Sequence, residues 1–405
     1  MSRYTLSFHA MVFTGALALT VAGVQLRAQD AISSEASAAS SIASSKGVTV
    51  LNVHGKAASM DFVHAKPQPL PINPFAEDST RALIQALAAG PGSGPSGHSD
   101  GAAGNGKTNS IFLGKPEAAQ NEEFSAEQFN AGDLTPEDFG TNNHPFSTAR
   151  ADLFTETTNT TYPYRAAGKL FFNEPGGSFI CSASLIKRGI VVTAAHCVAN
   201  FGKKQFYSNW QFAPGYRNGS APFGVWTVKQ AWILTSYYNG TDSCAVSGIV
   251  CADDVAVLIL NTQNGAYAGS NTGWFGYWYG GGFTSNGLVQ ITQLGYPAGL
   301  NSAAYMERND SQGYRSSSNS NNTIIGSNMN GGSSGGPWIV NFGLPYTLTG
   351  ETNGSGYTFT NALVGVTSWG YTSNSPKEQG AAPFTSGNIQ TLLNVACSAT
   401  PGACS

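Results

Sequence analysis

Charged side chains are scarce in this chain of 405 residues: Asp, Glu, Lys and Arg together make up only 11% of it, and the net charge is -3. Such a chain has no basic excess with which to attract nucleic acid or an anionic membrane surface, so neither is expected as a partner. What it has instead is 49 glycines and an aromatic fraction of 11%. That composition suits many short strands joined by tight turns better than it suits helices.

Cysteine is absent from the first 180 residues, and the six cysteines that follow lie in three pairs that are close in sequence. An even number of cysteines in an exported protein favours disulfides, although six cysteines can pair in many ways. We expect the local pairs, and six reduced, buried thiols are the alternative. The expected disulfides join Cys181 to Cys197, Cys244 to Cys251, and Cys397 to Cys404.

Long apolar runs are absent except at the N-terminus, where residues 1–28 begin with the basic Arg3, continue through an apolar run to Val24 and reach the small residue Ala28. This order is typical of a secretory signal peptide and predicts a secreted protein, with the periplasm or the cell surface as other destinations. A retained membrane anchor is the alternative, because the apolar run approaches the length of a membrane span. Once the signal peptide is removed, no contact with a membrane is expected.

Residues 29–150 change in composition several times, and a Gly/Ser/Pro-rich stretch at about 90–110 is typical of a flexible linker. We interpret residues 29–150 as a pro-segment or N-terminal extension that is processed somewhere within residues 140–162. A stable accessory domain is the alternative interpretation. The remaining residues, 151–405, would form the working domain.

Short apolar runs separated by turn residues fill the working domain, in one cluster at about 165–262 and a second at about 273–385. Residues 386–396 then repeat apolar side chains at helical spacing and predict a terminal helix. Two all-β clusters followed by one helix indicate either two packed barrels or a large sandwich.

Residues 330–338 read NGGSSGGPW, and so many consecutive small residues are poorly suited to packing. Glycine is tolerated where the backbone needs a positive φ or must approach a ligand closely. A serine held among such residues is a candidate nucleophile, because the neighbouring N–H groups are free to point at an oxyanion. Taken alone, the stretch would fit an ordinary Gly/Ser-rich loop equally well.

A serine nucleophile needs a base, usually histidine, and an acid that orients the histidine. Five of the six histidines precede residue 150, so His196 is the single histidine of the working domain. The acid is predicted to be Asp254, which immediately precedes the apolar run 255–260, where a desolvated carboxylate can still accept hydrogen bonds. Asp253 is the alternative. The order along the chain is therefore His196, Asp254, Ser334.

Two other kinds of hydrolase site fail on the same residues. Residues 332–336 satisfy the G-x-S-x-G pattern of α/β-hydrolases, but those enzymes place their histidine after the serine, and no histidine follows Ser334. A zinc site fails because one histidine and paired cysteines leave no set of ligands. We therefore expect neither a metal nor another cofactor.

In this order, the three motifs resemble the trypsin/chymotrypsin-like serine peptidases, and they look most like the secreted bacterial branch that contains the glutamyl endopeptidases. The motifs are TAAHC at 193–197, NMNGGSSGGP at 328–337 and TSWG at 367–370, and Cys181 stands where the cysteine partner of the first motif is found. The resemblance covers about residues 165–396. It implies an all-β fold of two packed antiparallel Greek-key β-barrels with the active site between them, followed by the C-terminal helix.

The resemblance also implies the activity, a secreted serine endopeptidase that acts as a monomer on proteins and peptides through an acyl-enzyme. Ser334 would be the nucleophile, His196 the base and Asp254 the group that orients the imidazole. The backbone N–H groups of Gly332 and Ser334 would form the oxyanion hole. Two alternatives are an esterase with the same triad and a catalytically silent binding or adhesion protein on this scaffold.

Substrate would be bound by two stretches, one before the nucleophile and one on the facing strand, where residues 368–370 would pair with an extended peptide. None of the expected pocket side chains is a carboxylate, which argues against Lys or Arg at the cleaved bond and favours a neutral or apolar residue. The residues expected to contact substrate are Asn328, Met329, Thr367, Ser368, Trp369 and Gly370.

Ser333 departs from the resemblance. Animal-type members carry an aspartate just before the nucleophile, and it pairs with an N-terminal amine that cleavage releases. With serine at this position the ion-pair switch cannot operate. Zymogen control is therefore expected to come from the N-terminal extension itself, either by blocking the site or by assisting folding.

Overall fold

Strands dominate the described part of the chain, as the composition predicts. The structure, a computed structural model, describes residues 40–73, 96–117, 144–153, 155–242, 251–280, 288–315, 323–343, 360–371 and 377–405. The predicted signal peptide and much of the predicted extension lie outside the described residues. Within the described residues, no helix is both long and apolar enough to cross a membrane.

The first barrel is a closed ring of six antiparallel strands in the order β15, β13, β8, β9, β10 and β16, and β15 also pairs with β16. Two of these strands, β10 and β16, consist almost entirely of apolar residues, and both are buried along their whole length. The bounds are β8 (Ala167–Glu174), β9 (Gly177–Lys187), β10 (Ile190–Thr193), β13 (Ser208–Pro214), β15 (Trp226–Leu234) and β16 (Ala256–Leu260).

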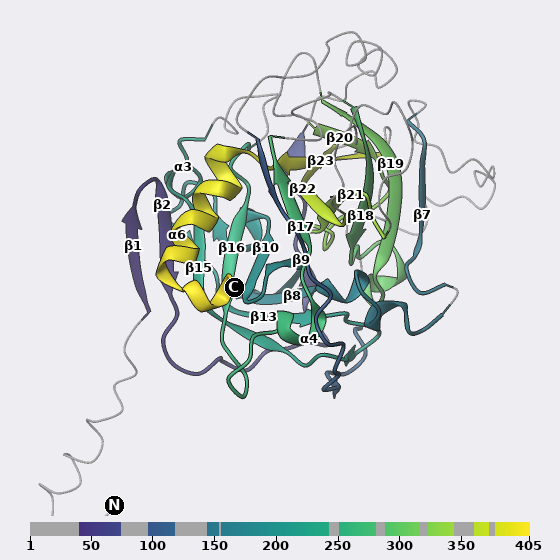
Figure 1. Cartoon of the computed structure of the whole chain (residues 1–405), viewed down its shortest axis with the longest axis horizontal. Helices are drawn as coiled ribbons and strands as arrows, with labels where there is room; N and C mark the ends of the chain where they lie inside the picture. The colour runs from purple at the N-terminus through teal and green to yellow at the C-terminus, as the bar shows by residue number, and fades with distance from the viewer. Residues whose placement is uncertain are drawn as a thin grey trace, which may run out of the picture. The chain divides into compact units, whose positions relative to one another are not determined.

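The second barrel closes in the same way, in the order β21, β18, β19, β20, β23 and β22, with β21 pairing back to β22. Figure 1 shows it in green beside the teal first barrel. The predicted pair of antiparallel barrels is thereby confirmed. The bounds are β18 (Leu288–Gly295), β19 (Glu307–Arg315), β20 (Thr323–Gly326), β21 (Pro337–Val340), β22 (Ala362–Tyr371) and β23 (Glu378–Pro383), while β17 (Gly276–Tyr279) lies parallel to β22.

The predicted C-terminal helix begins as a wider turn over Ser386–Gln390 and continues as α6 (Thr391–Ala399), which packs against β15 and β16 of the first barrel. Thr385 and Asn388 cap its start reciprocally, since each side chain accepts a hydrogen bond from the other residue's backbone N–H. The disulfide between Cys397 and Cys404 closes its end, as predicted.

Short elements join the strands of the barrels. They are β11 (Ala199–Asn200), β12 (Gln205–Phe206), β14 (Ser220–Ala221), α3 (Thr235–Asn239), α4 (Gly269–Thr272), helical turns at Thr158–Thr160, Tyr164–Ala166 and Ala195–Cys197, and a turn with positive φ at Asn301–Ala303. A further helical turn, Pro401–Ala403, follows α6.

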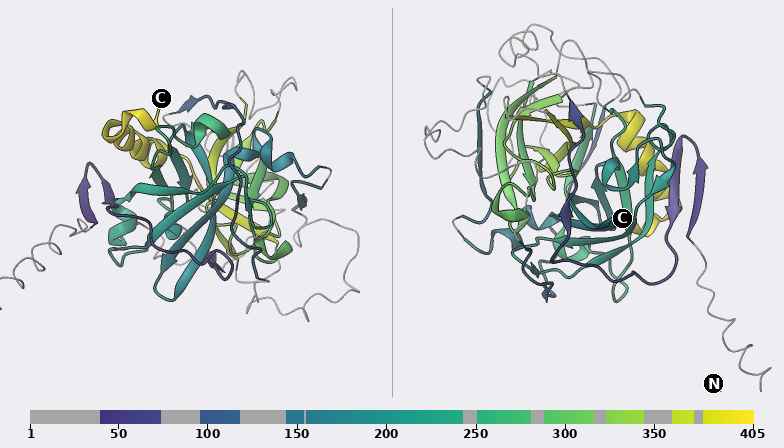
Figure 2. Two further views of the ribbon diagram at one scale, coloured as in Figure 1. Left: turned by 90° about the horizontal axis from the view of Figure 1, so that it is seen from below. Right: turned by 180° about the vertical axis from the view of Figure 1, so that it is seen from behind.

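Strands from the predicted extension are added to both barrels. The hairpin of β1 (Ser41–Ser45) and β2 (Val48–Asn52) pairs through β2 with β15 of the first barrel. Figures 1 and 2 show this hairpin in purple on the outside of that barrel. On the second barrel, β7 (Phe146–Arg150) pairs with β19. The predicted boundary at residue 150 therefore lies at the end of a paired strand, and processing near it stays a prediction.

Part of the predicted linker at about 90–110 is ordered, in contrast to the expectation of a flexible chain. Within this stretch β5 (Gly97–Ser99) pairs with β17, and just after it β6 (Ile111–Phe112) pairs with β14. The glycines are needed for close approach: a Cβ on Gly101 would lie 2.5 Å from the carbonyl oxygen of Trp274. Glycine needed for close packing and glycine in a flexible linker give the same sequence signal.

Candidate active site

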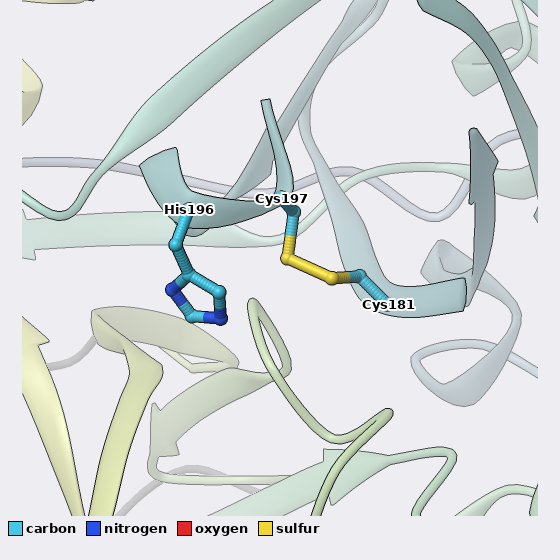
Figure 3. Close-up of side chains that lie close together, drawn as sticks. All are labelled: Cys181, His196 and Cys197. Atoms are coloured by element: carbon cyan, nitrogen blue, oxygen red, sulfur yellow. A yellow bond between two sulfur atoms is a disulfide. The ribbon is translucent and has the colours of Figure 1, made fainter. Parts of the chain in front are cut away.

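His196 is positioned by the end of β10 and by a disulfide. The strand stops at Thr193, and the helical turn Ala195–Cys197 then carries the histidine into the seam between the barrels. Figure 3 shows the bond from Cys197 to Cys181 on β9, directly beside the imidazole, and this is the first predicted disulfide. These three side chains are clustered closely enough to suggest a metal site, but both sulfurs are consumed by the disulfide and cannot ligate an ion.

Asp254 holds His196 by two hydrogen bonds at once. Its Oδ1 accepts from the backbone N–H of His196 at 2.8 Å, and its Oδ2 lies 2.8 Å from the ring Nδ1. The hydroxyl of Ser368 on β22 donates to the same Oδ2 at 2.5 Å. The carboxylate is only 1% exposed, so the hydrogen bonds rather than water stabilise its charge. This geometry fixes both the orientation of the ring and the tautomer with a proton on Nδ1.

Asp253, the alternative acid, is directed elsewhere. Its carboxylate accepts a hydrogen bond from Ser236, and its own backbone N–H donates to Asp242 at 2.8 Å. Burial raises the pKa of Asp253, although the hydrogen bond from Ser236 opposes that shift. The structure therefore places Asp254, rather than its neighbour, against the imidazole.

The loop between β20 and β21 carries Ser334, and two glycines allow its shape. Gly332 has φ +90° and Gly335 has φ +76°, which L side chains rarely adopt. A Cβ on Gly335 would lie 2.0 Å from the hydroxyl of Thr193, so that position also lacks the space for a side chain. Backbone hydrogen bonds join the loop to both barrels, from Ser182 N–H to Ser334 O at 2.7 Å and from Gly335 N–H to Thr367 O at 2.8 Å.

The buried polar atoms that have no hydrogen-bond partner within the described part of the chain include Ser334 Oγ and His196 Nε2, both at the seam. Buried polar atoms are nearly always paired, so an unpaired serine hydroxyl beside an unpaired imidazole nitrogen makes the seam the candidate site for an incoming group. The hydrogen bond between such a pair often forms only in the complex with substrate.

Ser333 is held by amides, whereas an aspartate here would need an ion pair. The Ser333 hydroxyl donates to the carbonyl of Asn330 at 2.6 Å and accepts from Gln379 Nε2 at 3.1 Å. Gln379 Oε1 in turn accepts from Gln293 Nε2 at 2.7 Å and from Ser327 at 3.2 Å. Every member of this buried network is a neutral side chain or a backbone carbonyl, and it fixes the residue that precedes the nucleophile.

The predicted substrate-binding residues differ in what they contact. Thr367 is fully buried, and its hydroxyl accepts hydrogen bonds from Gln293 at 2.8 Å and from Trp338 at 3.0 Å, which makes it part of the core of the second barrel. Met329 is buried, whereas Asn328 is exposed. Ser368 contacts Asp254, and Trp369 and Gly370 continue the same edge of β22.

Sequence reasoning missed the amide pair of Gln293 and Gln379, because nothing in a strand sequence distinguishes a bridging glutamine from an exposed one. It also set aside His144, which is buried in the second barrel. Its Nδ1 lies 2.7 Å from Glu378 Oε1, and its Nε2 lies 2.6 Å from the carbonyl oxygen of Gln312. Both ring nitrogens are engaged, so His144 is not a free base. The remaining predicted disulfide, Cys244 to Cys251, stays a prediction, because Cys251 is in a disulfide but Cys244 lies outside the described residues.

Comparison with protein families matches residues 154–389, more than half of the chain, to the trypsin family. Among solved structures, the serine protease AL20 from an extremophilic microorganism is 26% identical and covers 58% of this chain and 97% of its own, with a TM-score of 0.46. The protease Anisep from Arthrobacter nicotinovorans is 25% identical, with 58% and 96% covered and a TM-score of 0.45. A Glu endopeptidase in complex with MPD is 19% identical, with 64% and 98% covered and a TM-score of 0.45. No curated protein sequence matches this chain.

Proposed function

We propose, from the premise that this chain belongs to the trypsin family and is a serine endopeptidase, that it is a secreted enzyme with a His196–Asp254–Ser334 triad. The observation that carries the proposal is the buried chain of hydrogen bonds from Ser368 through Asp254 to the imidazole of His196. That chain leaves Nε2 as the free basic nitrogen of the ring, on the side away from the carboxylate.

In this mechanism Ser334 Oγ attacks the scissile carbonyl and passes its proton to His196 Nε2. The imidazolium then gives the proton to the leaving amine, and water repeats the sequence to release the acyl group. Asp254 stabilises the imidazolium because its charge is held in a nearly dry site. The N–H groups of Gly332 and Ser334 would bind the oxyanion, each for about 2.7–4 kcal/mol in the transition state.

A neutral or apolar residue at the cleaved bond is the specificity that the surrounding side chains favour. Met329 is apolar and buried, and the Thr367 hydroxyl is already engaged by Gln293 and Trp338. Glu378, on the strand that pairs with β22, is also buried and has its Oε1 within 2.7 Å of His144 Nδ1. The Oε1 atom of Glu378 is thus directed at His144 instead of at a Lys or Arg side chain of a substrate.

A diverse peptide library, incubated with the mature enzyme recovered from the culture medium, tests the proposal. Sequencing the cleavage sites reports activity and specificity together, and recovery from the medium tests export. Ser334→Ala should abolish cleavage, whereas Ser333→Ala should still cleave peptides because it keeps the nucleophile. Hydrolysis of short-chain esters without any peptide cleavage would indicate an esterase, and binding without turnover would indicate a silent scaffold protein.

A further inference from the structure

Residues 66–73 of the N-terminal extension, here called the cleft segment, run across the seam between the barrels. At the first barrel, β3 (Lys66–Pro67) lies parallel to β9, with Pro67 opposite Ile180. At the second barrel, β4 (Ile72–Asn73) lies parallel to β22, with Ile72 opposite Gly370. Seen from behind in Figure 2, the purple segment passes between the two barrels.

The middle of the cleft segment contacts the backbone of Gly332 and of His196, next to the candidate catalytic side chains. The carbonyl oxygen of Gln68 accepts a hydrogen bond from the Gly332 N–H at 3.1 Å, which is one of the two expected oxyanion donors. The Gln68 N–H donates to Ile180 O at 2.9 Å, and the side chain is only 9% exposed, with its Nε2 3.5 Å from the carbonyl oxygen of His196. A substrate carbonyl cannot use the same donor while Gln68 is bound to it.

The far half of the segment occupies the edge that a substrate would need. The N–H of Gly370 donates to Pro71 O at 3.0 Å, and a Cβ on Gly370 would lie 3.5 Å from Leu70 Cδ1. Residues 368–370 are the stretch on which an extended substrate would add as a strand. One segment therefore occupies one of the two expected oxyanion donors and also the edge on which a substrate would pair.

The direction of the segment is opposite to that of a productive substrate. The pocket for the residue at the cleaved bond is expected against β22, so the acyl half of a substrate, which precedes the scissile bond, would lie there and the leaving half would lie along β9. In the cleft segment, the residues before Gln68 lie along β9 and the residues after it lie along β22. The nitrogen of Pro69 would then leave on the side of the acyl pocket, away from the place where His196 delivers a proton to a leaving amine.

Alternate prolines suit this segment to its site. Pro67, Pro69 and Pro71 each fix φ, so the free segment is already extended and loses little conformational entropy when it binds. They also remove every second backbone N–H. Gln68, between two of the prolines, keeps its N–H and uses it to bind Ile180 O.

We propose that the substrate cleft binds residues 66–73 of this same chain in the reverse direction, as an inhibitory peptide ligand that Ser334 cannot cleave. The inference rests on the proposed function and adds its regulation: the chain with its extension is latent, and activity appears when the segment is removed or displaced. This fits the neutral Ser333, which leaves no ion-pair switch for activation.

The first test measures labelling by a fluorophosphonate in the intact full chain, resolved by mass from any processed form, and in the mature enzyme. We expect the full chain to react at least about 10-fold more slowly, which corresponds to an effective concentration of about 1 mM for the attached segment and a Kd of about 0.1 mM or lower for its binding. Gln68→Pro, which removes the donor to Ile180 O, should speed labelling of the full chain. Lys56→Ala, at an exposed site outside the segment, is the matched control and should leave the rate of labelling of the full chain unchanged.

The second test uses a synthetic peptide of residues 64–75 with the mature enzyme, so it does not depend on the variants folding. The peptide should inhibit competitively and remain intact after long incubation, and the Gln68→Pro peptide should inhibit less. Cleavage of the peptide at Gln68, or equal labelling of full chain and mature enzyme together with no inhibition by the peptide, would overturn the inference. A mature enzyme that neither labels nor hydrolyses peptides would instead refute the proposed function.

Discussion

Replacing Gln379 by leucine tests whether the buried amide network positions the nucleophile. The change keeps the approximate side-chain size and removes three hydrogen bonds, to Ser333, Gln293 and Ser327. At about 1 kcal/mol each for buried hydrogen bonds, the folded state should lose roughly 3 kcal/mol. Ser333 lies between the two expected oxyanion donors, so a shift of its backbone also misplaces the N–H groups on either side.

We expect kcat to fall even at a temperature where the destabilised variant is still fully folded. Loss of one well-placed oxyanion donor costs about 2.7–4 kcal/mol, or about 10²- to 10³-fold in kcat, with little change in KM. The assay is peptide hydrolysis by the mature enzyme at a temperature well below unfolding, with the thermal midpoint measured separately. Gln312→Leu, at an exposed position on β19, is the matched control and should leave kcat unchanged. A lowered thermal midpoint with wild-type kcat in Gln379→Leu would show that the network only stabilises the fold.

Three further changes test other parts of the structure. Asp254→Asn should lower kcat about 10⁴-fold through the wrong imidazole tautomer, while Asp253→Asn should cost far less; the reverse ranking in peptide hydrolysis would move the acid by one residue. Gly335→Ala should prevent the native loop from forming, because φ is +76° and the added Cβ would meet Thr193 at 2.0 Å; a soluble, fully active variant would contradict this. Burial lowers the pKa of Lys169 from 10.5 to about 7. Between these two pH values the unfolded chain therefore binds more protons than the folded chain does. The free energy of unfolding should accordingly rise by about 5 kcal/mol as the pH increases across this range. Lys169→Met should lose this rise in urea unfolding, and an unchanged slope would refute it.

The candidate catalytic groups could be predicted from the sequence because each of them has a recognisable local sequence context. A nucleophile loop needs glycines at positive φ, and residues 331–336 carry them. His196 follows a buried strand and Asp254 precedes one, so their places at strand ends were readable from the apolar runs beside them. The two clusters of short runs likewise predicted the two barrels.

The rest depends on contacts between residues that are far apart in the chain. The cleft segment binds through the backbone carbonyl of Ile180 and the backbone N–H groups of Gly332 and Gly370, and backbone groups of this kind give no sequence signal. Gln379 reaches a serine 46 positions away, and His144 meets a glutamate 234 positions away, so neither pair could be found by spacing.

The most direct measurement identifies the residue that a fluorophosphonate modifies in the mature enzyme, by mass spectrometry of the digested adduct. We predict a single adduct on Ser334 that is absent after Ser334→Ala and strongly reduced after His196→Ala, because the serine reacts only when the imidazole takes its proton. An adduct on Ser333, or labelling that persists in Ser334→Ala, would contradict the assignment of the nucleophile.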